Sequence, residues 1–429
     1  MVRRFFAGAF AAVIVASLFA GCSSSSATNG PVTISLWHNY GTEANATATA
    51  DLVKAYETAH PNVTINVVSQ PANNYFDLLK AAAISKSGPC LATQWTGLFT
   101  LQNASYLEKL NSYIPLDTLK KMKGIEWGSD NFDPASGVYV VPLEMQTYNG
   151  FYNKALFAQA GITTFPTDWS EFMDAVQKLK AAGIQPMVYG TGAQGLTAGF
   201  YPYYDLSYMM MYLPVADWKK LYDGDIKWTD PAIKAQLDKW VALHAGGYTN
   251  QDVLNNTESW QQFLGGKAAM TLEGTWAIAD AEKALGTNVG VFTPPFSDQP
   301  IKGIVEFPGD GFAMTNYCSD KSVAADFLNY MTTTDAQNII AKDGLIPALD
   351  GSTTSDPIAQ QLLAYAANDG YTRYPMIDNV IQPEVVDTAS KVLVAAFGGT
   401  MSTQDALQQM QDTLDQLPAS RRSTTYTGS

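Results

Sequence analysis

The segment 268–279, AAMTLEGTWAIA, places a carboxyl group and an indole within four positions, as Glu273 and Trp276. An acid beside an aromatic ring could be a catalytic acid, the pair could line a binding cleft, or the segment could be a turn that happens to contain an aromatic residue. The apolar run predicts a strand, Gly274 a tight turn, and Thr275 the cap of the helix that follows. We expect Trp276 to face a cleft, whereas Glu273 either touches a ligand hydroxyl or braces the turn.

The sequence carries no motif of a metal site or of a common catalytic centre. His38, His60 and His244 have no paired spacing, so each is interpreted as an ordinary polar residue. There is no G-x-S-x-G elbow, phosphate-binding loop, dinucleotide-binding fingerprint or H-E-x-x-H helix. Candidates for the two carboxylates of a glycosidase are Glu43, Glu144, Glu273 and Asp310. Because any acidic chain offers such a set, we expect a binding protein without catalytic residues, metal or cofactor.

Strand and helix signals alternate in the N-terminal part of the chain. Strands are predicted at 32–37, 63–68 and 90–95, with helices at 43–60 and 74–85 between them. This alternation is typical of a parallel, doubly wound α/β sheet, whose ligands bind at the carboxyl ends of the strands. Two of those ends read WHNYG and WTGLF, which places aromatic side chains where a ligand would lie.

A second unit begins near residue 137 and is rich in helix signals. A helix is predicted at 168–182, where Asp168 and Glu171 resemble a capping box, and another begins at Asp230-Pro231. Three tryptophans on apolar helix faces are interpreted as core residues: Trp169, Trp240 and Trp260.

The first 21 residues are predicted to be a signal peptide. Arg3 and Arg4 precede an apolar stretch, and small residues stand before Cys22 as in a bacterial lipobox. We expect cleavage before Cys22, its lipidation, and a flexible tether over 22–30. Export by the general secretory or the twin-arginine route stays open. No later run has the roughly 18 apolar residues of a membrane span, so a lipid anchor alone would hold the protein to the outer face of the cell membrane.

The formal net charge is −14, and aromatic residues are plentiful for a chain that is only 15% charged. An acidic surface repels nucleic acid and anionic lipid head groups, so neither is an expected partner. Apart from Cys22 the chain has two cysteines, Cys90 and Cys318. Outside the cytoplasm, an even pair of this kind favours a disulfide.

Three stretches resemble the family 1 extracellular solute-binding proteins of ABC importers, the group that includes maltose-binding protein. They are VYVVPLEMQTYNGFYNKALFAQAGITTFPTDWSEF at 138–172, FLGGKAAMTLEGTWAIA at 263–279 and YETAHPNVTINVV at 56–68. The similarity runs from about residue 31 to 417. It implies an α/β periplasmic-binding-protein fold of type II, with two lobes, hinge crossings between them and a ligand cleft in the middle.

The resemblance also implies where the lobes begin and end. Lobe 1 is expected at 31–141 and 302–346, and lobe 2 at 142–301 and 347–417. Pro142 and Pro347 would lie near the crossings, where a restricted φ suits a hinge-flanking segment. The tail at 418–429 has no core-forming residues and is expected to be disordered.

Residues that match ligand-binding positions of the family come from both lobes. They are Trp37, Asn39, Glu43, Trp95, Gln146, Tyr201, Tyr203, Trp276, Asp310 and, near the start of a late helix, Gln382 or Glu384, of which Glu384 is preferred. The tryptophans would stack on the ligand, while Asn39, Glu43, Gln146 and Asp310 would hydrogen-bond. Cys318 ends a strand expected to lie antiparallel beside the third strand, so the resemblance implies a Cys90–Cys318 disulfide.

The function implied is that of a monomeric, lipid-anchored receptor, which captures a disaccharide or short oligosaccharide and delivers it to an ABC permease. The same fold could instead bind a non-sugar solute. A polyol phosphate would need arginine or lysine in the cleft, which the strand-end segments lack, whereas a polyamine would need several carboxylates and is harder to exclude. An extracellular glycoside-active enzyme would share the aromatic and acidic residues, and a sensor or adhesin would bind the sugar without a permease.

Overall fold

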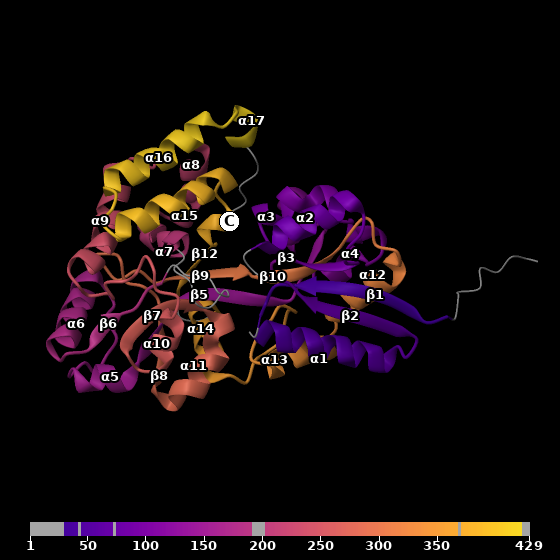
Figure 1. The fold of residues 1–429 in the computed structure, drawn as a ribbon, viewed down its shortest axis with the longest axis horizontal. Helices are drawn as coiled ribbons and strands as arrows, with labels where there is room; N and C mark the ends of the chain where they lie inside the picture. Colours follow the sequence, from indigo (N-terminus) through magenta and orange to yellow (C-terminus); the bar gives the residue numbers. More distant parts are fainter. Residues whose placement is uncertain (1–29, 42–43, 72–73, 191–201, 368–369, 423–429) are drawn as a thin grey trace, which may run out of the picture.

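Two lobes stand side by side, and strands near the middle of the molecule join them (Figure 1). This computed structural model describes residues 30–41, 44–71, 74–190, 202–367 and 370–422. The expected signal peptide, the lipidated Cys22 and nearly all of the tether therefore lie outside the described residues. Within the described ranges, no helix combines the length and the apolar character that crossing a membrane requires.

The first lobe is built on a five-stranded sheet in the order β2-β1-β3-β10-β4. Its N-terminal elements are β1 (Val32–His38), α1 (Ala44–Ala59), β2 (Val63–Ser69), α2 (Tyr75–Ser85) and β3 (Leu91–Trp95). These bounds confirm the predicted alternation, and β1 pairs in parallel with β2 and β3. The sheet is not wholly parallel, because β10 (Asp310–Met314) runs antiparallel to both β3 and β4 (Val140–Pro142).

Helices cover this first sheet on both faces (Figure 1). Beside α1 and α2 they include α3 (Leu98–Asn103), α4 (Leu116–Leu119), α12 (Lys321–Met331) and α13 (Thr334–Lys342). Buried residues of α1 pack inward, among them Leu52, Val53 and Tyr56. The helices of the first lobe thus bury apolar side chains against its own sheet.

The second lobe is organised around the long strand β5 (Glu144–Asn153). Its seven-stranded sheet has the order β12-β9-β5-β7-β6, and two further strands pair with β5. The other strands are β6 (Gln185–Met187), β7 (Ala268–Gly274), β8 (Val289–Phe292), β9 (Gly303–Pro308), β11 (Ile346–Pro347) and β12 (Thr372–Tyr374). Most of β5 is buried, so it forms the structural centre of the molecule.

Helices surround this second sheet. They are α5 (Lys154–Gln159), α6 (Trp169–Ala181), α7 (Pro202–Met209), α8 (Trp218–Asp223), α9 (Pro231–Ala245), α10 (Ser259–Leu264), α11 (Ile278–Leu285), α14 (Pro357–Ala367), α15 (Pro383–Phe397) and α16 (Thr403–Gln416). The start of α6 confirms the predicted cap, because the Asp168 carboxylate accepts the backbone N–H of Glu171 at 2.9 Å. The Glu171 carboxylate in turn accepts the N–H of Thr167, one residue before the cap.

The chain crosses between the two sheets at three places. It leaves β4 at Pro142 and enters β5 at Glu144, and it leaves β9 at Pro308 and enters β10 at Asp310. The third crossing leads from α13 into β11, which pairs with β5. The second crossing lies later than the expected residue 302, because β9 pairs with β5 and β12 and so belongs to the second lobe.

The C-terminal segment is more ordered than the sequence predicts. Residues 419–422 form the short helix α17 (Ala419–Arg422), and the Arg421 guanidinium forms an ion pair with Glu384. The expected disorder is therefore wrong for 418–422, where a side-chain contact to α15 holds the chain. Residues 423–429 lie outside the described residues.

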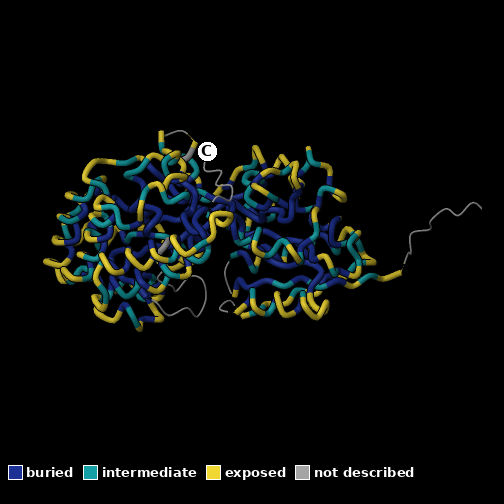
Figure 2. Tube along the Cα trace, turned by 90° about the horizontal axis from the view of Figure 1, so that it is seen from above, coloured by how far each residue is buried: buried dark blue, intermediate teal, exposed yellow. Residues whose placement is uncertain are grey.

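Much of the aromatic content is buried inside the second lobe, and buried chain runs through the interior of both lobes (Figure 2). Trp240 and Trp260 are almost fully buried, as predicted, whereas Trp169 is only partly buried at the core edge. Trp218 and Trp228 are also core residues. The high aromatic content therefore supplies core packing as well as any ligand surface.

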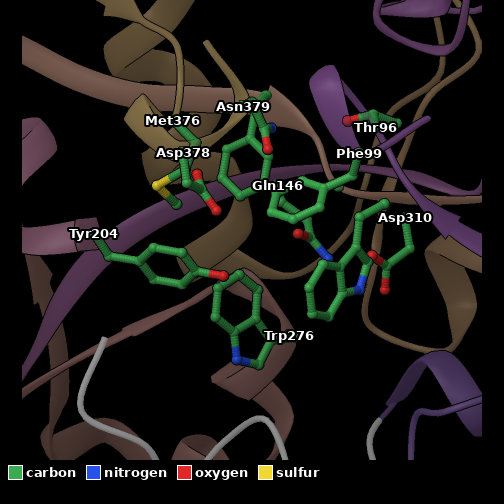
Figure 3. A pocket seen from close by; sticks show the side chains of 12 residues that line it. Thr96, Phe99, Gln146, Tyr204, Trp276, Asp310, Met376, Asp378 and Asn379 are labelled. Atoms are coloured by element: carbon green, nitrogen blue, oxygen red, sulfur yellow. The ribbon is translucent and has the colours of Figure 1, made fainter. Parts of the chain in front are cut away.

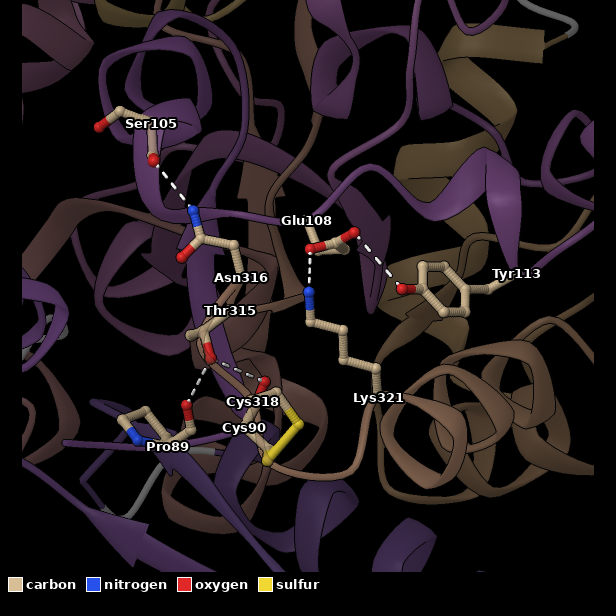
Figure 4. A network of polar contacts seen from close by, with 9 residues as sticks. All are labelled: Pro89, Cys90, Ser105, Glu108, Tyr113, Thr315, Asn316, Cys318 and Lys321. Carbon is tan, nitrogen blue, oxygen red and sulfur yellow. Dashed lines mark hydrogen bonds and ion pairs between the residues drawn. A yellow bond between two sulfur atoms is a disulfide. The ribbon is translucent and has the colours of Figure 1, made fainter. Parts of the chain in front are cut away.

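A disulfide joins Cys90, at the start of β3, to Cys318, which follows β10 (Figure 4). Hydrogen bonds brace the same region: the Thr315 hydroxyl donates to the Pro89 carbonyl at 2.8 Å, and the Asn316 amide donates to the Ser105 carbonyl at 3.0 Å. The implied pairing is thus present, because the antiparallel register of β3 and β10 brings the two sulfurs together.

Removing this bridge with Cys90→Ala and Cys318→Ala together is expected to lower the free energy of unfolding by about 2–4 kcal/mol. The reason is that the bridge spans 228 residues and restricts the unfolded chain. Urea unfolding of the two proteins, both carrying Cys22→Ala, measures the difference. Thiol titration of the denatured, unreduced parent serves as the control, and two reactive thiols there would contradict the bridge.

Candidate ligand-binding site

A cavity lies between the lobes, with an empty volume of about 550 Å³ that includes space open to solvent. The first lobe contributes Trp95, Thr96, Phe99 and Asp310, and the second contributes Gln146, Tyr204, Trp276, Phe307, Met376, Asp378 and Asn379, with Gly309 at the crossing (Figure 3). Four of the residues expected at the ligand are brought together here: Trp95, Gln146, Trp276 and Asp310. The wall is therefore a mixture of aromatic rings, amides and carboxyl groups.

Trp95 and Asp310 are neighbours because of strand pairing. They are directly opposite each other in the antiparallel ladder of β3 and β10, so their side chains share one face of the sheet. The Trp95 ring is held edge-to-face by Phe76 and Phe99, with centroid distances of 4.8 and 5.3 Å. A fixed indole thus stands beside a carboxyl group in the first-lobe wall.

Trp276 is positioned by two residues that precede it in the chain. It lies in η9 (Thr275–Ala277), and its indole N–H donates to the Glu273 carboxylate at 3.0 Å. Gly274 is required beneath the ring, because a Cβ there would collide with the indole. Glu273 is itself buried, so the structure supports bracing rather than ligand contact for this acid.

Thr275 does not cap the following helix. Its hydroxyl accepts the backbone N–H of Thr147 on β5 at 3.2 Å, and no side chain caps η9. The predicted cap is therefore wrong, because a tertiary bond to the neighbouring strand uses the hydroxyl. This bond ties the turn that carries Trp276 to the central strand of the lobe.

Gln146 is fixed by groups at two of the crossings. Its side-chain N–H donates to Glu144 Oε1 at 2.8 Å, and its amide lies against Gly309, where any Cβ would collide with it. Asn45 of α1 donates to the same oxygen of Glu144. The Glu144 carboxyl therefore links the first lobe, the central strand and an amide in the cavity wall.

Burial changes the acidity of these carboxyl groups. Glu144 has no exposed surface, and burial raises its pKa to about 7 although the two amide donors favour the charged form. Burial also raises the pKa of Asp378 to about 7. Burial, and then the charge of Glu144, raise the pKa of Asp310 well above its usual range. Glu144 and Asp378 are therefore poised to exchange protons near neutral pH.

Several lining residues were not anticipated from the sequence. Tyr204 stands on α7, where its ring lies edge-on to Trp276 at 6.5 Å, while Asp378 and Asn379 belong to η11 (Ile377–Asn379). Thr96 and Phe99 belong to the aromatic strand end WTGLF, so the sequence did contain a signal that could have placed these two residues at the cavity. No local pattern marks η11, because only the folded chain brings it over the cavity.

Asn379 reaches the first lobe directly. A Cβ added to Gly97, whose φ is 74°, would lie 2.8 Å from the Asn379 Cβ. Gly97 thus permits close contact between a loop of lobe 1 and η11 of lobe 2. The two lobes meet here, across one side of the cavity.

Other expected residues do not line this cavity. Trp37 packs against Tyr75, Leu79 and Ala92 within the first lobe. Asn39 is buried there, and neither polar atom of its side chain has a partner among the described residues. Their strand end does not reach the space between Trp95 and Trp276.

The two C-terminal candidates also point elsewhere. Glu384 pairs with Arg421, and the Gln382 amide donates to the Tyr222 carbonyl at 2.9 Å. Glu43 and Tyr201 lie outside the described residues, as does the Tyr203 side chain. In place of Glu384, the neighbouring Asp378 and Asn379 contribute polar groups to the cavity.

The three histidines have separate local partners. His38 accepts the backbone N–H of Tyr40, His60 pairs with Asp326, and His244 bonds to Thr249. Across the described residues, no three side chains of His, Cys, Asp or Glu are grouped to hold a metal ion.

Glu144→Gln is expected to make the stability less dependent on pH. The folded protein binds the Glu144 proton more tightly than the unfolded chain, because burial raises its pKa from 4.5 to about 7. The favourable contribution is complete below about pH 4.5 and is lost as the pH rises through about 7. Glutamine keeps an oxygen for Asn45 and Gln146 but cannot titrate. As the pH rises from about 5 to about 8, the free energy of unfolding of the variant, measured with urea, should increase relative to that of the parent.

The control for this measurement is Asn45→Ala, which removes one donor to the charged form. Its stability should fall more steeply with rising pH than that of the parent. Parallel profiles for the parent and Glu144→Gln would show that Glu144 does not titrate in this way.

Known proteins share this architecture. The family model for bacterial extracellular solute-binding proteins matches residues 51–366. The multiple sugar-binding protein of Streptococcus mutans is 26% identical over 348 residues, which cover 78% of this chain and 80% of that protein. The sn-glycerol-3-phosphate-binding periplasmic protein of Salmonella typhimurium is 26% identical over 295 residues, covering 63% and 62%.

A solved structure extends the likeness to nearly the whole chain. A chitin oligosaccharide binding protein superposes with a TM-score of 0.77 at 24% identity, covering 90% of this chain and 98% of that one. At this identity the match concerns the fold, and the two-lobed arrangement is common to both. Since the family model covers most of the described lobes, the chain belongs to the bacterial extracellular solute-binding protein family.

Proposed function

We propose that this chain is an extracytoplasmic receptor that captures a disaccharide or short oligosaccharide and delivers it to the permease of an ABC importer. The observation that carries the proposal is the composition of the interlobe cavity. Aromatic rings from both lobes face it, and amides and carboxyl groups stand between them. Rings of this kind stack on the C–H faces of sugars, while the polar groups bind the hydroxyls at the ring edge.

The relatives support the same ligand class. A sugar-binding protein is similar to this chain over most of both lengths, and a chitin oligosaccharide binding protein shares its fold. The relative that binds sn-glycerol-3-phosphate suggests an anionic ligand instead. A phosphate is normally bound by arginine or lysine, and neither is among the described residues that line this cavity. The lining therefore favours the sugar.

Capture by closure of the lobes explains why the site is divided. Trp95 and Asp310 belong to the first lobe, whereas Trp276 and Asp378 belong to the second. A ligand that contacts both sets stabilises the closed arrangement over the open one. Binding proteins of two lobes use such hinge closure, and the three crossings of this chain provide the hinge. The closed form would then be the one that the permease recognises.

The place of action follows from the N-terminal sequence. We propose that lipidated Cys22 anchors the receptor to the outer face of the membrane and that the tether leaves the lobes free to reach the permease. A monomer suffices for this role, because both cavity walls come from one chain. The site is proposed to bind the sugar without reaction.

A panel of maltose, raffinose, cellobiose, N,N′-diacetylchitobiose, xylobiose and galactose, together with their amino-sugar counterparts, tests the ligand class. At a hundredfold excess over its dissociation constant, a bound sugar should stabilise the fold by about 2.7 kcal/mol. Thermal unfolding and tryptophan fluorescence report this binding. No response to any panel member would remove the sugar proposal.

Trp276→Ala is expected to weaken sugar binding at least tenfold, or about 1.4 kcal/mol, because it removes a stacking surface. Glu273→Gln should cost less, since the glutamine oxygen still accepts the indole N–H that orients the ring. Isothermal titration with the best panel sugar measures both. Trp37→Ala is the matched control, a tryptophan outside the cavity, and should leave the affinity nearly unchanged. A larger loss from Glu273→Gln than from Trp276→Ala would reverse the assignment of the two roles.

A further inference from the structure

We propose that the sugar bound in this cavity carries a protonated amine, because two buried carboxyl groups face the cavity from opposite lobes and no basic side chain accompanies them among its described lining. The inference rests on the proposed function and adds the charge of the ligand to it. The residues concerned are Asp310 and Asp378, which point into the same space in Figure 3. Their surroundings decide what a ligand must supply.

Asp310 stands at the first residue of β10 with only 8% of its surface exposed. No hydrogen bond or ion pair joins its carboxyl group to another described residue. Its close neighbours are themselves acidic or neutral, since Glu144 and the buried Tyr40 lie within electrostatic range. The described part of the protein therefore provides no charge to balance Asp310.

Asp378 approaches from the second lobe in η11, with 6% of its surface exposed. Its Oδ1 atom has no partner among the described residues, although backbone N–H groups near it favour the charged form. Arg373 is close in sequence, but it pairs with Glu306 at 3.0 Å. The basic side chain nearest to Asp378 in the sequence is therefore already in an ion pair with another residue.

Neither the described cavity lining nor the internal segments outside the description contain a lysine or arginine that could pair with these carboxyl groups. Lysine and arginine are absent from the described lining of the cavity. The internal ranges outside the description are 42–43, 72–73, 191–201 and 368–369, and their sequences contain neither residue. A cationic ligand would therefore meet no basic side chain in the described lining of the cavity.

Two buried carboxyl groups with no basic partner among the described residues are costly when charged, and a ligand gains by removing that cost. A sugar hydroxyl supplies one neutral donor, whereas an ammonium group supplies three donors and a full charge. Hydrogen bonds from a charged donor to a carboxylate are about twice as strong as neutral ones. The same cavity should therefore discriminate between an amino sugar and its neutral analogue.

The aromatic wall adds to this preference. Trp95 is the direct strand partner of Asp310, so an ammonium bound by the carboxylate can also lie over the indole face. Attraction between a cation and an aromatic face is strongest for tryptophan. The amides of Gln146 and Asn379 also line the cavity, and sugar hydroxyls can hydrogen-bond to them while the methylene groups of a linear polyamine cannot. An amino sugar satisfies both sets of groups.

The test compares ligands that differ only in the substituent at C2 of each ring. The disaccharide series compares chitobiose, which has two free amines, with N,N′-diacetylchitobiose and cellobiose, which share its skeleton and linkage. Two monosaccharide series compare glucosamine and galactosamine with their N-acetyl and hydroxyl analogues. Isothermal titration of the full chain near neutral pH should give the free amine a dissociation constant at least tenfold lower than that of both neutral members, in at least one series. Equal or weaker binding of the amine in every series would overturn the proposal.

Asp310→Asn and Asp378→Asn identify the source of the preference. Each variant should reduce the advantage of the amine at least tenfold while changing the affinity for the neutral analogue much less. The matched control is Asp174→Asn, an exposed carboxylate on α6 that pairs with Lys178, and the preference should survive it. Retention of the full preference in both cavity variants would overturn the assignment to these two carboxyl groups.

The outcomes separate this inference from the function on which it rests. Binding of a neutral panel sugar such as raffinose, with no response to the amines, would overturn the charge proposal and leave the sugar receptor intact. Binding of spermidine with silence across all sugars would overturn both, and so would silence across every compound.

Discussion

The hydrogen bonds that Glu144 accepts from Asn45 and Gln146 connect the parts on which this structure depends. Asn45 belongs to the first lobe, Glu144 opens the central strand just after a crossing, and Gln146 faces the cavity. A buried carboxyl group left without donors would be costly, so the folded chain must keep these three residues together. That requirement ties α1 of the first lobe to the central strand beside a crossing, and it orients an amide at the site.

The aromatic side chains divide between two tasks according to what lies under and beside them. Trp240 and Trp260 fill the second lobe, where large buried rings give density to the core. Trp276 stands at the cavity because Gly274 leaves room beneath the ring and Glu273 accepts its N–H. Trp276 thus faces the cavity because a small residue and a hydrogen-bond acceptor hold its ring there, whereas Trp95 is held by the rings of Phe76 and Phe99.

The chemistry of the cavity refines what family membership implies. Relatives of this chain include a sugar-binding protein and a protein that binds sn-glycerol-3-phosphate, a polyol phosphate. In this chain the cavity is acidic, with Asp310 and Asp378 on opposite sides and no basic residue among its described lining. The charge of a site is set by a few side chains that strand pairing and one short helix bring together, so members of one fold can differ in the charge of the ligand they accept.

The sequence by itself determined the local elements and the family. Alternating strand and helix signals predicted β1 to β3 with the helices between them, and cap residues predicted α6 and α9, because these depend on neighbouring residues. The resemblance to the solute-binding family also pointed to Trp95, Gln146, Trp276 and Asp310. Only the tertiary structure decided that Asp378 and Asn379 reach the cavity, that Trp37 and Glu384 do not, and that the second crossing lies at Pro308–Asp310. These outcomes depend on strand pairing and lobe contact between segments far apart in the chain, which no local pattern records.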